Sequence, residues 1–286
     1  MATDPNVVML LECRDHPGIV ADVARFITDV GGNIVDAAQH TDRSHGTFFQ
    51  RLEFTTDGLA FPVSELSARF APIAERHGMR VNLRFTQWRP RTVVCVSKPL
   101  HCAGDLLTRS AIGELSLDIA AVVSNHRDVE SLANAFGVPF HHVPLDGDRA
   151  AQESSFATTL AELDPELVVL ARYMLVLPEW IVERYRERMI NIHHSFLPAF
   201  IGANPYRQAH DRGVKIIGAT AHYVTADLDE GPIIDQDVVR VTHRDDVADL
   251  TRRGRDLEVM VLARAVRAHV EHRVMVSGQR TVVFDG

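Results

Sequence analysis

The chain has 286 residues, enough for about two domains, and its 46% hydrophobic and 24% charged residues are ordinary for a folded protein. A formal net charge of −8 argues against binding of nucleic acid or of anionic membranes, so we expect neither as a partner. Three widely spaced cysteines predict no disulfide framework and no zinc site. The sequence has no apolar stretch of ~20 residues and opens on no leader pattern, which predicts a cytoplasmic protein.

The first part of the chain predicts a ferredoxin-like unit in domain 1, residues 1–86. Gly31-Gly32 is expected to end its first helix, and Pro72 lies inside the second helix, where it predicts a kink. The expected order is βαββαβ, with strands at 6–12, 33–41, 47–55 and 80–85 and helices at 19–30 and 63–77. Residues 87–91 break both patterns and are expected to be the linker.

Residues 92–286 predict a second α/β domain with a Rossmann-like, mostly parallel sheet. Apolar strands are expected at 92–96, 117–123, 139–143, 167–171 and 188–193, and helical stretches separate them. Strands near 219–224 and 233–241, a long helix over about 245–272 and a closing hairpin at 274–284 follow. Thr242 is expected to cap that helix.

Polar side chains end the strand that is expected at 188–193. Asn191 and His193 alternate with Ile192, so both should point to one face of an extended chain. An amide donor beside an imidazole suits polarising a carbonyl group and moving a proton. Taken alone, a polar strand end with no chemical role explains this pattern equally well.

A second polar motif follows farther along the chain. Thr220 and His222 should share one face of a strand, and the loop after it is rich in acids and closes with Gly-Pro. An acid in this loop can orient a histidine. For Asp227 and Glu230 we prefer a solvated turn.

Together the two motifs resemble those of the formyltransferase-type hydrolases and transferases that use 10-formyltetrahydrofolate, and the resemblance runs from about Arg91 to the C-terminus. It rests on Asn-x-His-x-Ser-x-x-Pro and on Gly-x-Thr-x-His followed by Asp-x-Asp-x-Gly. The resemblance implies a folate substrate with no cofactor and no metal. By position it implies catalytic roles for Asn191, His193 and Asp229, supporting roles for His222 and Ser195, and a folate pocket that includes Met174, Leu175, Leu177 and Leu228.

The resemblance also bears on the acceptor of the formyl group. Related transformylases hold the phosphate of their acceptor in a glycine-rich loop after the first strand, whereas residues 97–105 lack a glycine cluster and contain Pro99. The stretch is more similar to that of the formyltetrahydrofolate deformylases, which implies hydrolysis to formate and tetrahydrofolate with water as acceptor. Formyl transfer to a nucleotide or an amine is the alternative, as is an amino-acid sensor with a vestigial catalytic domain.

Residues 6–86 resemble an ACT domain, through the turn Asp15-His16-Pro17-Gly18-Ile19, the turn Gly31-Gly32-Asn33-Ile34 and the strand order. ACT domains often bind amino acids where two copies pair, so the resemblance implies a homo-oligomer and an effector, with glycine or methionine as candidates. The effector residues would include Asp15, Gly18 and Asn33. A purely structural or oligomerising module fits the same residues.

Overall fold

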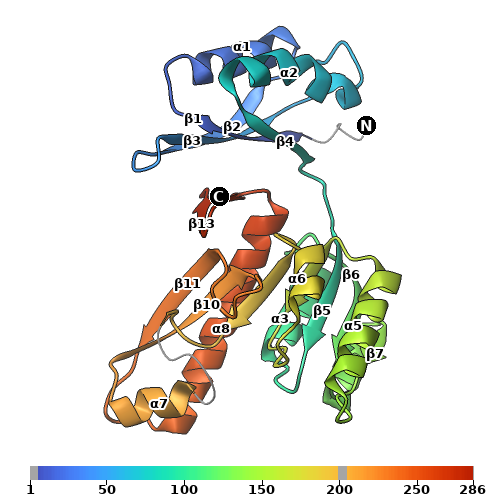
Figure 1. The fold of residues 1–286 in the computed structure, drawn as a ribbon, viewed down its shortest axis with the longest axis vertical. Coiled ribbons are helices and arrows are strands. Elements are labelled where there is room, and N and C mark those ends of the chain that lie inside the picture. The colour runs from blue at the N-terminus through green and yellow to red at the C-terminus, as the bar shows by residue number, and fades with distance from the viewer. Residues whose placement is uncertain (1–5, 199–204, 286) are drawn as a thin grey trace. The chain divides into compact units, whose positions relative to one another are not determined.

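The computed structural model describes residues 6–198 and 205–285, which form two compact units (Figure 1). Unit 1 contains the chain up to Trp88, then Glu271–Ser277 and the residues from Val282 on; unit 2 contains Arg89–Val270 and Gly278–Thr281. We expected residues 92–286 to form one domain. Most of the C-terminal segment instead groups with unit 1, where His272 stacks on Trp88 with ring centroids 4.9 Å apart.

Unit 1 has the expected ferredoxin-like order. Its antiparallel sheet has the strand order β2-β3-β1-β4, and α1 and α2 complete the βαββαβ arrangement. A short 3-10 helix, η1 (Val63–Glu65), precedes α2. The elements are β1 (Val7–Arg14), α1 (Ile19–Asp29), β2 (Ile34–Asp42), β3 (Thr47–Phe54), α2 (Leu66–His77) and β4 (Arg80–Phe85).

Alternation along β1 and β3 gives this sheet two different faces. One face carries the buried apolar residues that pack with α1 and α2, among them Met9, Leu11 and Leu52. The other face carries Arg51, which is 6% exposed, pairs with Asp36 and donates to the carbonyl oxygen of Glu271. The C-terminal segment therefore adds a hydrogen bond to a buried cation whose charge Asp36 and Glu53 balance. It leads into the hairpin of β12 (Val274–Ser277) and β13 (Arg280–Val283).

Unit 2 is built on a seven-stranded sheet of order β11-β10-β9-β8-β5-β6-β7. The pairs among β5 to β9 are parallel, and β10 runs antiparallel to both of its neighbours, so the expected mostly parallel sheet is confirmed. The elements are β5 (Arg91–Val96), α3 (His101–Ala111), β6 (Asp118–Ser124), η2 (Arg127–Val129), α4 (Glu130–Ala135), β7 (Phe140–His142), α5 (Arg149–Leu163), β8 (Leu167–Leu170), α6 (Glu179–Arg184), β9 (Met189–His193), α7 (Pro205–Arg212), β10 (Ile216–Tyr223), β11 (Ile233–Arg240) and α8 (Val247–Val270).

The chain changes direction across this sheet at β5. From β5 it passes outward to β6 and β7, and it then returns to the other side of β5 to form β8 and β9. Such a switch point opens a crevice at the carboxyl ends of the strands, where ligands bind in open α/β sheets. All four residues of β8 are buried, which explains its uninterrupted apolar sequence.

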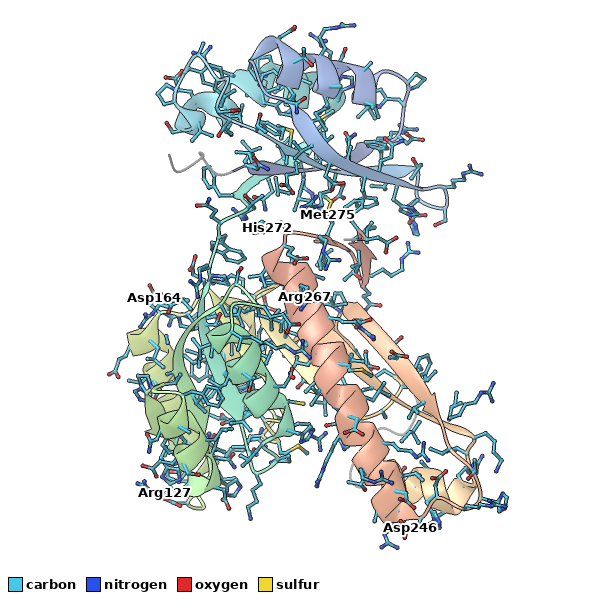
Figure 2. All side chains as sticks on the ribbon, turned by 180° about the vertical axis from the view of Figure 1, so that it is seen from behind. Arg127, Asp164, Asp246, Arg267, His272 and Met275 are labelled. Carbon is cyan, nitrogen blue, oxygen red and sulfur yellow. The ribbon has the colours of Figure 1, made fainter. Side chains whose placement is uncertain are left out.

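The long helix α8 begins later than we expected, and a different residue caps it. Asp246 accepts a hydrogen bond from the backbone N–H of Asp249, whose carboxylate accepts in return from the N–H of Asp246. Thr242 bonds Asp245 in the preceding turn and lies too far from the helix to cap it. Figure 2 shows Asp246 at the start of α8 and Arg267 near its other end, an arrangement that suits the helix dipole.

None of the helices within the described residues is both long and apolar enough to cross a membrane. Residues 1–5, from which we expected the absence of a leader, lie outside the described residues.

Candidate active site

The pairing of β9 with β10 brings the two polar motifs together. Asn191 lies directly opposite His222, and His193 lies opposite Thr220. Residues that are directly opposite in an antiparallel pair share a face. The four side chains therefore occupy one face of the sheet, at the end of β9.

The loop of residues 224–232, which we call the acid loop, brings Asp229 to the same face. Oδ2 of Asp229 lies 3.2 Å from Nδ1 of His193, and Oδ1 lies 3.6 Å from Nε2 of His222. Burial opposes the ionised form of Asp229, but the hydrogen bond from His193 favours it, and the pKa of this carboxyl is held well below its usual range. Asp229 is therefore a carboxylate near neutral pH.

The hydrogen bonds of the site fix where its protons lie. Nδ1 of His222 is 2.9 Å from the carbonyl oxygen of Tyr223, which only accepts, so Nδ1 carries the proton. In neutral His222 the lone pair of Nε2 then accepts from Nδ2 of Asn191 at 3.2 Å. The second N–H of Asn191 stays available to a ligand.

His193 offers the complementary group. Its Nδ1–H donates to Asp229, and its buried Nε2 has no hydrogen-bond partner among the described residues. A buried nitrogen without a partner in such a place is typical of a group that meets substrate. Asn191 and His193 thus present an N–H donor and an imidazole nitrogen side by side.

A second set of hydrogen bonds supports the segment after β9. The hydroxyl of Thr220 donates to the carbonyl oxygen of Ser195 at 2.9 Å and accepts from the N–H of Leu197 at 3.1 Å. The amide of Gln236 donates to the same hydroxyl at 2.8 Å. Ser195 is buried, and its main chain takes part in holding the loop.

The loop after β8, residues 171–178, borders a cavity of about 780 Å³ at the switch point. Met174 and Leu175 line it, together with residues that follow β5, β6 and β7. The backbone N–H of Met174 donates to Oγ of Ser97 at 3.0 Å, so this donor is not free to bind a ligand. Leu177 packs against the buried core, whereas Leu228 is 58% exposed on the acid loop.

The three candidate effector residues of unit 1 do not form one cluster within a chain. Asp15 and Gly18 are exposed in the turn before α1, whereas Asn33 is exposed in the turn after it. The eleven residues of α1 span ~16 Å, which separates the two turns.

Within the described part of the chain, one group of side chains lies close enough to hold a metal ion. It consists of His101, Cys102 and Glu258, whose ligand atoms lie within 4.8 Å of one another. The oxygens of Glu258 already bond His101 and Tyr206, and the Arg172 guanidinium is adjacent. Burial raises the pKa of the Cys102 thiol well above its usual value, so the thiol stays protonated and is a poor ligand.

Several residues that support the site were not among those that the sequence motifs indicated. The Tyr223 carbonyl sets the tautomer of His222, and Gln236 braces Thr220. Glu258 lies among buried apolar residues of α8, and this interruption of an apolar stripe is the one signal that the sequence offers for it.

Comparison with known proteins places the chain in a class. Residues 90–266 match the formyl transferase family, and residues 7–58 match the ACT domain. The chain belongs to the formyl transferase family and carries an ACT domain ahead of the formyl transferase part.

Several relatives that match nearly the whole chain share one name. The formyltetrahydrofolate deformylase of Synechocystis sp. is 50% identical over 280 residues, which cover 98% of each chain. The Bacillus subtilis protein of that name is 46% identical over 279 residues, covering 97% of this chain and 93% of the relative. The crystal structure of a formyltetrahydrofolate deformylase from Pseudomonas syringae matches with a TM-score of 0.95 at 45% identity and covers 100% of this chain and 96% of that one.

We expect that replacing Gly231 by alanine displaces the acid loop. The added Cβ would lie 1.7 Å from the carbonyl oxygen of Tyr223 and 3.2 Å from Nδ1 of His222. Overpacking of this kind costs about 1–3 kcal/mol, so chemical denaturation should show a lower midpoint. Gly104→Ala is the control, because its nearest neighbour would be 3.8 Å away. A Gly231→Ala protein as stable as the parent would contradict this packing.

Proposed function

We propose that this chain hydrolyses 10-formyltetrahydrofolate to tetrahydrofolate and formate. The observation that carries the proposal is the common position of the Asn191 N–H and Nε2 of His193 on one sheet face, where this nitrogen has no hydrogen-bond partner among the described residues. The chain also matches deformylases over nearly its whole length. An amide donor and an imidazole are what attack on a formyl carbonyl requires.

The proposed reaction begins with a water molecule that attacks the formyl carbon. Nε2 of neutral His193 takes the proton of the water, and the N–H of Asn191 donates to the oxyanion that forms. The imidazolium then gives this proton to N10 as the bond between carbon and N10 breaks. Formic acid leaves and ionises to formate.

Asp229 remains ionised throughout this sequence. Its carboxylate holds Nδ1–H of His193, so Nε2 is the nitrogen that exchanges protons, and it stabilises the imidazolium when that forms. His222 accepts one N–H of Asn191, which leaves the second N–H for the substrate.

The first test is incubation with 10-formyltetrahydrofolate in the absence of any acceptor. We expect equal amounts of formate and tetrahydrofolate, at a rate that added glycinamide ribonucleotide or EDTA does not change. Turnover that appears only with a ribonucleotide or an amine would favour formyl transfer. A chain that binds amino acids but never turns over the folate would indicate a vestigial catalytic domain.

The second test is Asp229→Asn, which removes the charge but keeps the size of the side chain. Asparagine tolerates the φ of 58° at this position, so the loop should keep its shape. Without the carboxylate the imidazolium is less stable, and we expect kcat to fall by at least ~10²-fold with little change in KM. Asp227→Asn makes the same charge change at an exposed acid of the same loop and should leave kcat unchanged. Equal kcat values for the two variants would contradict the role of Asp229.

We further propose that the ACT domain binds an amino acid between two copies of the chain. The ~16 Å between its two candidate turns is too long for one small ligand within a chain, whereas pairing of two copies can bring the turn before α1 of one to the turn after α1 of the other. Glycine and methionine remain the candidates, because both depend on the supply of one-carbon units.

Calorimetry and kinetics with millimolar glycine and methionine test this proposal on the full chain. We expect one of them to change folate affinity by roughly 5–150-fold. Asp15→Asn should abolish the response and keep basal activity, whereas Asp29→Asn, an exposed acid on α1, should preserve both. If neither amino acid binds, the domain is a structural or oligomerising module.

A further inference from the structure

Glu258 is a buried carboxylate in the middle of α8 that hydrogen-bonds two other elements of unit 2 and forms an ion pair with a third. It is 1% exposed. Its Oε2 lies 2.7 Å from Nε2 of His101 at the start of α3, and its Oε1 accepts from the hydroxyl of Tyr206 on α7. Its third partner is the guanidinium of Arg172 in the loop after β8, with Nε 3.3 Å from Oε2.

The Arg172 contact holds the loop that borders the switch-point cavity. Arg172 has a φ of 66°, a conformation that disfavours a side chain, yet its side chain is only 12% exposed. Its carbonyl oxygen accepts from the N–H of Ser97, and Oγ of Ser97 accepts from the N–H of Met174. The ion pair with Glu258 therefore fixes the first turn of residues 171–178.

The Tyr206 contact reaches the histidines at the end of β9. The Tyr206 ring packs edge-on against His194, with centroids 6.1 Å apart, and the His194 ring lies 5.1 Å from that of His193. Gly254 on α8 leaves room for this tyrosine, since a Cβ there would lie 2.1 Å from its hydroxyl oxygen. The hydroxyl of Tyr206 is thus held on Glu258, and its ring supports the catalytic strand end.

The charge of Glu258 matters as well as its shape. Burial opposes the ionised form, but the hydrogen bond from His101 and the Arg172 guanidinium lower the pKa of Glu258 below its usual value. Burial, the Arg172 guanidinium and His193 lower the pKa of His194 to about 3, so His194 is neutral near pH 7. The charge of Arg172 therefore acts on His194, and Glu258 balances that charge.

We propose that Glu258 is a positioning residue that couples the loop after β8 to the histidine end of β9 and balances the buried charge of Arg172. The effect of Glu258 on catalysis rests on the proposed hydrolysis. The structural coupling of the two segments does not depend on it. A neutral residue of the same shape would keep hydrogen bonds to His101 and Tyr206, but it would leave the buried guanidinium without a counter-charge.

Hydrogen–deuterium exchange tests the coupling in the free protein, independently of activity. In Glu258→Gln we expect faster exchange in both residues 171–178 and residues 193–197. Arg172→Met should accelerate exchange mainly in the first segment, and Tyr206→Phe mainly in the second. Asp256→Asn, an exposed acid on the same helix, should change neither. Unchanged exchange in both segments of Glu258→Gln would overturn the proposal, and the two other variants decide it if that protein does not fold.

Kinetics test the charge balance. We expect kcat/KM of Glu258→Gln to fall at least ~10-fold, with partial recovery in Arg172→Met/Glu258→Gln, which has no unpaired buried charge. The charged and titratable groups around His193 and His194 are Asp229 on the acid loop, His222 on β10, and the pair Arg172 and Glu258, which acts on His194.

The acid limb of kcat/KM against pH separates this role from a merely structural one. The limb should move to lower pH in Glu258→Gln, because an unbalanced cation disfavours imidazolium, and to higher pH in Arg172→Met. Loss of activity with an unmoved limb in both variants would overturn the charge balance. Absence of hydrolysis in the parent chain would defeat the proposed function, while the exchange experiment would still decide the coupling.

Discussion

The site depends on one carboxylate that is shared between two imidazoles. Asp229 lies 3.2 Å from His193 and 3.6 Å from His222, and the same His222 holds Asn191. Asp229 therefore contacts both histidines, and through His222 it is connected to Asn191. The backbone around it is shaped for this contact, with a φ of 58° at Asp229 and a glycine at position 231 against the Tyr223 carbonyl. The conformation of the acid loop therefore places the carboxylate of Asp229 against His193 and His222.

The parts of the molecule that the sequence predicted well are those with a strong local pattern. Uninterrupted apolar runs marked the buried strands, and alternation placed Asn191 and His193 on one face before any pairing was known. The order of strands and helices in unit 1 followed from periodicity and glycine turns. In each of these cases the deciding information lies within about ten residues of chain, the range over which backbone geometry is periodic.

The remaining features depend on contacts between distant residues, which a local pattern does not encode. A C-terminal segment looks the same in sequence whichever unit it packs with, so the grouping of most of it with unit 1 was not predicted. Thr242 and Asp246 are both residue types that cap helices well. Because α8 begins at Val247, Asp246 is the residue that caps it. The role of Glu258 depends on His101, which bonds it from 157 positions away in the sequence.

The grouping of the C-terminal segment with unit 1 has a consequence for synthesis of the chain. Unit 1 needs residues from both ends of the sequence, because buried Arg51 donates to the carbonyl oxygen of Glu271. While the ribosome makes unit 2, the nascent first domain can pair Arg51 with Asp36 and Glu53 but still lacks the Glu271 carbonyl oxygen and the rest of the C-terminal segment. Domains generally fold from the N-terminus as they emerge. Here the first domain to emerge is the last to be completed, so a polypeptide released early leaves an open sheet face to be recognised by chaperones and proteases.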